Sequence, residues 1–90
     1  MSDMEILPLI NYLQIFLDVG KKVLDGVNVE GVDMDAFARF VMSEEILQEI
    51  RTLKRKLFLD RLFSKTSRNM YRFLSHVEDV VLANRFKLEN

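Results

Sequence analysis

Proline and glycine are scarce in this sequence, and their scarcity limits the folds that it can adopt. The 90 residues contain one proline and three glycines, the residues on which tight turns most often depend. Alternating runs of β-branched and polar residues are absent, whereas apolar residues recur every three or four positions. The sequence therefore predicts an all-α fold, and its length predicts a single domain over residues 1–90.

Capping residues and apolar periodicity predict four helices, three long and one short. The first is expected from about Leu7 to Leu24, with Pro8 in its first turn, where proline is tolerated. The short second helix is expected over Met34–Met42, with Asp33 as its N-cap.

The third and fourth helices are expected to lie next to each other in the sequence. Ser43 can cap the third helix, which the apolar pattern extends to about Phe63. Ser64 or Thr66 can cap the fourth, which reaches about Phe86.

The segment between the first two helices has the spaced acids and the central glycine of a calcium-binding loop. A loop aligned on Gly31 would end at Phe37, and a loop that starts at Asp25 would end at Ala36, whereas calcium needs a bidentate glutamate there. The segment is better explained as a connector, in which Gly26 ends one helix and Asp33 begins the next. We expect no metal and no cofactor.

Residues that carry chemistry are few. The chain has no cysteine, which excludes disulfides, cysteine-based zinc sites and thiol catalysis. Its one histidine, His76, is expected to be structural or exposed, because Glu78, two residues further on, does not face it on a helix. Glu44, Glu45 and Glu49 are expected to be solvated charges near a positive helix N-terminus. The sequence therefore predicts a protein that is not an enzyme.

Two of the predicted helices carry more apolar surface than one small core can bury. On the third helix, apolar residues change sides, because Phe58 and Leu62 lie across from Ile50 and Leu53. On the first helix, a second apolar stripe lies away from the main one. We therefore expect a homodimer that also docks on a larger protein, with these candidate interface residues: Tyr12, Ile15, Val19, Phe58, Leu59, Leu62 and Phe63.

Charge is distributed unevenly along the chain. Residues 1–50 carry ten acids against three bases, and residues 51–90 carry ten bases against four acids. One hypothesis is that the basic half folds against the acidic half. The alternative is a nucleic-acid-binding protein that contacts phosphates through a basic helix–turn–helix segment, with these candidate residues: Arg51, Lys54, Arg55, Lys65, Arg68 and Arg72.

The sequence does not predict a membrane protein. The first apolar run is interrupted by Asn11, Gln14 and Asp18, and the residues before it are acidic rather than basic as in a signal peptide. Together with the absence of cysteine, these features lead us to expect a cytoplasmic protein.

Overall fold

A computed structural model of the chain describes residues 3–89, with side chains from Pro8 onward. Within this range the fold is all-α, as predicted, and contains no strand. The elements are α1 (Asp3–Leu24), α2 (Met34–Met42), α3 (Glu44–Leu57), the 3₁₀ helix η1 (Asp60–Leu62) and α4 (Lys65–Glu89). None of these helices is both long and apolar enough to cross a membrane.

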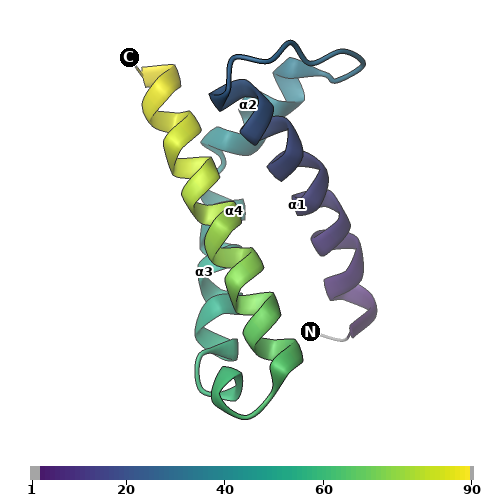
Figure 1. Cartoon of the computed structure of the whole chain (residues 1–90), viewed down its shortest axis with the longest axis vertical. Helices are drawn as coiled ribbons and strands as arrows, with labels where there is room; N and C mark the ends of the chain where they lie inside the picture. The colour runs from purple at the N-terminus through teal and green to yellow at the C-terminus, as the bar shows by residue number, and fades with distance from the viewer. Residues whose placement is uncertain (1–2, 90) are drawn as a thin grey trace.

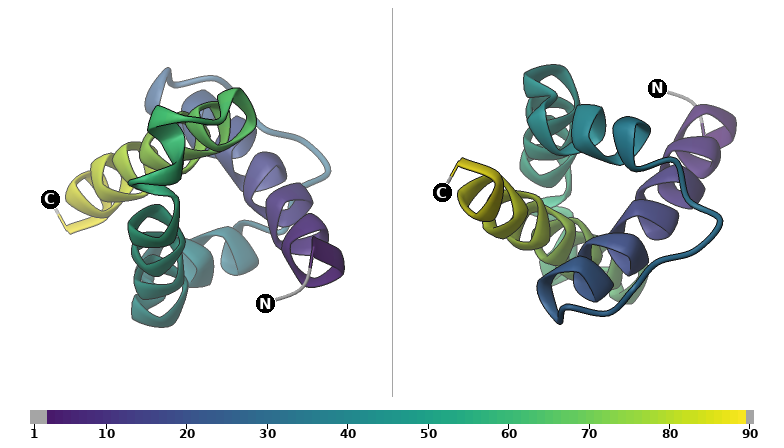
Figure 2. Two further views of the ribbon diagram at one scale, coloured as in Figure 1. Left: turned by 90° about the horizontal axis from the view of Figure 1, so that it is seen from below. Right: turned by 90° about the horizontal axis from the view of Figure 1, so that it is seen from above.

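The longest helix, α4, forms the spine of the molecule. Its 25 residues span about 37 Å at the usual helical rise, and the longest dimension of the protein is 40 Å. The other three helices all pack against α4. In Figure 1, α3 descends to a turn at the bottom and α4 returns beside it to the C-terminus. Seen along the long axis in Figure 2, the helices surround a common centre.

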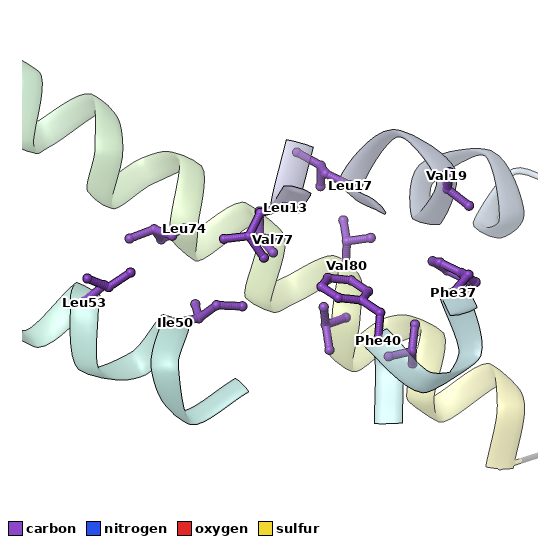
Figure 3. Packing of buried hydrophobic residues seen from close by; sticks show 12 residues of the cluster. Leu13, Leu17, Val19, Phe37, Phe40, Ile50, Leu53, Leu74, Val77 and Val80 are labelled. Atoms are coloured by element: carbon purple, nitrogen blue, oxygen red, sulfur yellow. The ribbon is translucent and has the colours of Figure 1, made fainter. Parts of the chain in front are cut away.

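That centre is filled by apolar side chains from all four α-helices. Leu13 of α1, Ile50 of α3 and Leu74 of α4 have no exposed surface. Figure 3 shows how side chains from separate helices meet. The whole buried cluster consists of Leu13, Leu17, Val19, Phe37, Phe40, Val41, Ile50, Leu53, Leu74, Val77, Val80 and Val81.

A close contact between α1 and α4 depends on Gly20. A β-carbon at this position would lie 2.6 Å from Cγ1 of Val80, which is too close for two carbon atoms. The buried side chain of Asn84 lies beside this contact and donates hydrogen bonds from Nδ2 to the carbonyls of Gly20 (3.3 Å) and Val80 (2.9 Å). The absence of a side chain at Gly20 thus lets the two backbones approach.

Two basic residues near the end of α4 bind carbonyls at the ends of other helices. Arg85 donates from Nε to the carbonyl of Val41 and from Nη2 to that of Ser43 (3.1 Å). Lys87 donates from Nζ to the carbonyl of Val23 (2.9 Å). The last carbonyls of a helix lack intrahelical partners and carry partial negative charge. These bonds therefore attach α4 to the C-terminal ends of α1 and α2.

The connector between α1 and α2 has the predicted helix end. Gly26 has a φ of 74°, in the left-handed region that favours glycine. Its N–H donates to the carbonyl of Val23 (3.1 Å), and the N–H of Val27 donates to that of Lys22 (2.9 Å). This pair of bonds is the Schellman motif, which satisfies carbonyls that the helix leaves unpaired.

The other end of the connector begins α2 at the predicted residue. The Asp33 carboxylate accepts hydrogen bonds from the N–H groups of Asp35 (3.0 Å) and Ala36 (3.1 Å). It therefore satisfies two of the N–H groups that a helix start leaves free. The predicted range of α2, Met34–Met42, is confirmed.

Three predicted helix ends differ from the structure, those of α1, α3 and α4. The first helix begins at Asp3 rather than near Leu7, so Pro8 lies inside it and not in its first turn. The helix passes through Pro8 because a proline this close to the start removes only one hydrogen bond. The last helix continues beyond Phe86 to Glu89, over a stretch in which Lys87 is anchored to α1.

Candidate functional site

The turn between α3 and α4 is built differently from the prediction. Helix α3 ends at Leu57 and does not continue to Phe63. From Phe58 to Phe63, backbone hydrogen bonds span three residues instead of four. The N–H of Leu62 donates to the carbonyl of Leu59 (3.2 Å), and that of Phe63 donates to the carbonyl of Asp60 (3.0 Å). This tighter winding, typical of helix ends, leads into the reversal of the chain.

Side-chain hydrogen bonds fix the start of α4 to the turn. The N–H of Ser67 donates to Oγ of Ser64 (3.3 Å), so that Ser64, and not Thr66, is the capping residue. The hydroxyl of the buried Ser67 donates to the Asp60 carboxylate. The N–H of Ser64 also donates to the Asp60 carbonyl (2.9 Å). The turn is thus held by both its backbone and its side chains.

Four large apolar side chains of this turn are exposed, and we call them the apolar turn. Phe58 is 48%, Leu59 70%, Leu62 60% and Phe63 88% exposed. Ile50 and Leu53, earlier on α3, are buried. The two apolar sets therefore face different surroundings, although they do not lie on opposite sides of one helix as predicted.

The candidate interface residues on α1 have different environments. Val19 is only 5% exposed and belongs to the core, so its assignment to an interface was wrong. The reason is that α1 packs against both α2 and α4 and buries more of its circumference than one stripe. Ile15 is 60% exposed. Tyr12 is partly covered, because its ring lies 4.8 Å from that of Phe16 and 5.7 Å from that of Phe40.

Two of the predicted phosphate-binding residues already bind a carboxylate. Arg51 Nε lies 2.9 Å from Glu78 Oε2, and Lys54 Nζ lies 3.2 Å from Glu78 Oε1. Burial raises the pKa of Glu78, but hydrogen bonds and charge from the two cations outweigh burial, so that its pKa lies below the usual value. Glu78 therefore neutralises part of the positive surface.

The acidic partner of these cations comes from the basic half of the sequence. The hypothesis that the basic segment pairs with residues 1–50 was therefore wrong for Arg51 and Lys54. Over residues 8–89 one ion pair does join the two halves, between Arg85 Nη1 and Glu44 Oε1 (2.6 Å). This ion pair lies at the start of α3, whereas Arg51 and Lys54 lie in its second half.

A shallow depression with a volume of about 440 Å³ lies between α3 and α4. Tyr71 contributes one wall, and its ring lies under Lys54 Nζ, which is 5.2 Å from the ring centroid. Arg61 stacks over the neighbouring Phe58 ring at 4.3 Å. Cations at these distances interact favourably with aromatic faces. The residues that line the depression are Arg51, Lys54, Arg55, Phe58 and Tyr71.

The six predicted cations do not form one site. Arg51, Lys54 and Arg55 line the depression, whereas Lys65, Arg68 and Arg72 are exposed on α4 and do not.

Sequence reasoning missed Tyr71 and Glu78 as parts of this surface. A signal for both was present: Tyr71 and Glu78 are seven residues apart on α4, and so share one face.

The groups that this surface presents are apolar side chains, cations and aromatic rings. His76 is exposed on α4. Among the described residues, no group of three or more His, Cys, Asp or Glu side chains is arranged to hold a metal ion. The surface offers exposed apolar side chains, cations and stacked aromatic rings, which are means of binding another molecule.

Comparisons of the chain with family models, curated proteins and solved structures found no match in any of the three.

Proposed function

We propose that this protein is a non-enzymatic interaction module that docks on a larger protein through the apolar turn. The observation that carries the proposal is the exposure of Phe58, Leu59, Leu62 and Phe63 within six consecutive residues. Single exposed apolar residues are common on protein surfaces, whereas contiguous groups of large ones mark binding sites.

The energetics of the turn favour docking. Burial of one large apolar side chain contributes about 1.5–3 kcal/mol, so that burial of all four would be a substantial part of the free energy of a stable complex. Hydrogen bonds among Asp60, Ser64 and Ser67 already order the turn. A partner therefore meets a preorganised surface, and less conformational entropy is lost on binding.

The proposal is tested by chemical crosslinking in the native host, followed by mass spectrometry. Leu62→Asp places a charge in the apolar turn. Leu88→Asp is the matched control, since Leu88 is similarly exposed (57% against 60%) and lies near the other end of α4. We expect a specific protein partner that is captured by wild type and by Leu88→Asp and lost with Leu62→Asp. Equal capture by both variants would contradict the proposal.

Self-association and a cytoplasmic location belong to the same proposal. The exposed Ile15 on α1 supports self-association, and the lack of cysteine suits a reducing compartment.

Nucleic-acid binding is the second candidate, and the depression between α3 and α4 favours it. Single-stranded nucleic acids bind where cations meet aromatic rings, and three cations and two rings line this depression. Glu78→Gln removes the charge that holds Arg51 and Lys54, so that this function predicts tighter oligonucleotide binding by the variant. Fluorescence anisotropy with labelled single-stranded and double-stranded oligonucleotides tests this function, and the absence of binding at ~50 mM salt excludes it.

A further inference from the structure

We infer that the segment that docks on the apolar turn is an acidic stretch of protein chain with apolar anchor residues. The inference rests on the proposed function and adds the chemistry of the partner. It follows from the charges that surround the four exposed apolar side chains.

Positive charge surrounds the apolar turn on both sides. Between residues 55 and 72 the chain has six cations and one carboxylate. That carboxylate, Asp60, already accepts a hydrogen bond from Ser67. Arg61 stacks on Phe58. The remaining five cations make no ion pair with any described residue: Arg55, Lys56, Lys65, Arg68 and Arg72.

The order of these residues places an apolar centre inside a charged border. Arg55 and Lys56 lie in the last turn of α3, just before the apolar turn. Lys65 and Arg68 lie in the first turn of α4, just after it. Protein interfaces commonly have an apolar core and a polar rim. Complementary charge at the rim selects the partner and speeds association. A partner with apolar anchors and carboxylates around them matches both parts of this surface.

A second copy of the chain fits this surface poorly. In a two-fold dimer the same patch meets itself, so that Arg55, Lys56 and Lys65 would face their own copies. Like charges brought together at an interface are unfavourable. A head-to-tail contact with the acidic half of another copy would avoid this repulsion, but such a contact forms a ring or an open filament and not a two-fold dimer.

Nucleic acid also fits the surface less well than a protein segment. The cations nearest the aromatic rings, Arg51 and Lys54, are held by Glu78. Arg61 covers one face of the Phe58 ring, on which a base would stack. Leu59 and Leu62, two of the exposed residues, offer no ring for stacking. Protein–nucleic-acid interfaces are more polar than this turn.

The test uses the full chain and two labelled peptides, each about 18 residues long. Both carry Leu and Phe at positions i, i+3, i+4 and i+7. One has glutamate at the remaining positions and the other has lysine. Fluorescence anisotropy should detect binding of the glutamate peptide at ~50 mM salt and weaker binding as salt screens the charges. The lysine peptide should bind at least tenfold more weakly, a difference of about 1.4 kcal/mol.

Variants of the protein separate the apolar and the charged contributions. Leu62→Gln, which removes an apolar side chain without adding a charge, should weaken binding of the glutamate peptide about tenfold or more, whereas the control Leu88→Gln should not change it. The double variant Lys56→Glu and Lys65→Glu, with Leu62 intact, should reduce the preference for glutamate over lysine. Circular dichroism melts check that each variant is folded.

Three results would overturn the inference: equal binding of the two peptides, displacement of the glutamate peptide by a single-stranded oligonucleotide, or a dimer in sedimentation that Leu62→Asp abolishes. If the glutamate peptide does not bind but Leu62-dependent capture of a host protein persists, only the inference on charge is wrong. If the glutamate peptide does not bind and no host protein is captured in a Leu62-dependent way, the proposed function is wrong as well.

Discussion

At the scale of single residues, Gly20 and Asn84 determine how closely α1 and α4 pack. A buried asparagine is stable only when its polar atoms are bonded, and Asn84 bonds the carbonyls of both helices. An alanine at Gly20 would have to displace Val80 Cγ1, with which its β-carbon would overlap.

Gly20→Ala should therefore lower the free energy of unfolding, although alanine is the better helix former. Overpacking of a core costs about 1–3 kcal/mol, whereas the gain in helix propensity is about 0.5–1 kcal/mol. Addition of Val80→Ala should relieve the overlap, so that the double variant loses less stability than the sum of the single variants. Val77→Ala is the control, since Val77 is buried but does not contact Gly20. Urea denaturation gives the free energy of unfolding of the three single variants and of the two double variants that combine Gly20→Ala with Val80→Ala or with Val77→Ala. Additive effects of Gly20→Ala and Val80→Ala would refute the overlap.

A second prediction at this scale concerns Glu78 and pH. Because the folded pKa of Glu78 lies below the usual 4.5, its carboxylate stabilises the fold above that value, and the contribution is lost as pH falls through the folded pKa. Glu78→Gln should cost about 1 kcal/mol at neutral pH, and the two proteins should converge in stability at acidic pH. Asp79→Asn, at the exposed neighbouring position, is the control, because it removes a carboxylate that makes no ion pair with any described residue. A difference for Glu78→Gln that is independent of pH would contradict this account.

At the scale of elements, the features that depend on nearby residues were predictable from the sequence, and those that depend on contacts between distant residues were not. The bounds of α2 follow from Asp33, which caps its start, and from Ser43, which ends α2 and caps the start of α3. Each side chain bonds N–H groups no more than three residues away. The turn after α3 contains a bond between Asp60 and Ser67, which helical periodicity does not reveal. Likewise, the apolar periodicity of α1 placed Val19 on a second apolar stripe, but it could not show that both α2 and α4 pack against α1. Charge counts could not identify Glu78 as the partner of Arg51.

The two apolar sets of the α3 region should respond differently to the same substitution. Ile50→Asp should unfold the chain, because Ile50 has no exposed surface and an unpaired buried charge costs several kcal/mol out of a total of about 5–15 kcal/mol. Leu62→Asp should leave a helical protein with a cooperative melt within about 0.5 kcal/mol of wild type, since Leu62 is 60% exposed. Circular dichroism melts compare the two. If Leu62→Asp also unfolds the chain, the apolar turn is part of the core and not a docking surface.

At the scale of the whole molecule, two exposed apolar surfaces differ in charge. The apolar turn lies among five cations without an ion pair to any described residue. On α1, the residues within one turn of Ile15 on the same face are Asn11, Tyr12, Asp18 and Val19, and Asp18 is the one charged residue among them. A surface that meets its own copy is stable when it carries little net charge, because like charges then do not face each other. We therefore assign self-association to the Tyr12–Ile15 face of α1 and partner binding to the apolar turn.

This assignment predicts a homodimer that one substitution on α1 converts to a monomer. Light scattering at micromolar or higher concentration should give about twice the 10.6 kDa mass of the chain. Ile15→Asp should reduce the mass to that of the monomer, because it places two charges opposite each other across a two-fold axis. Leu62→Asp should leave the dimer intact, which makes it the matched control with equal exposure on the other surface. A wild-type chain that stays monomeric throughout would contradict the homodimer. A dimer that only Leu62→Asp disrupts would instead move self-association to the apolar turn.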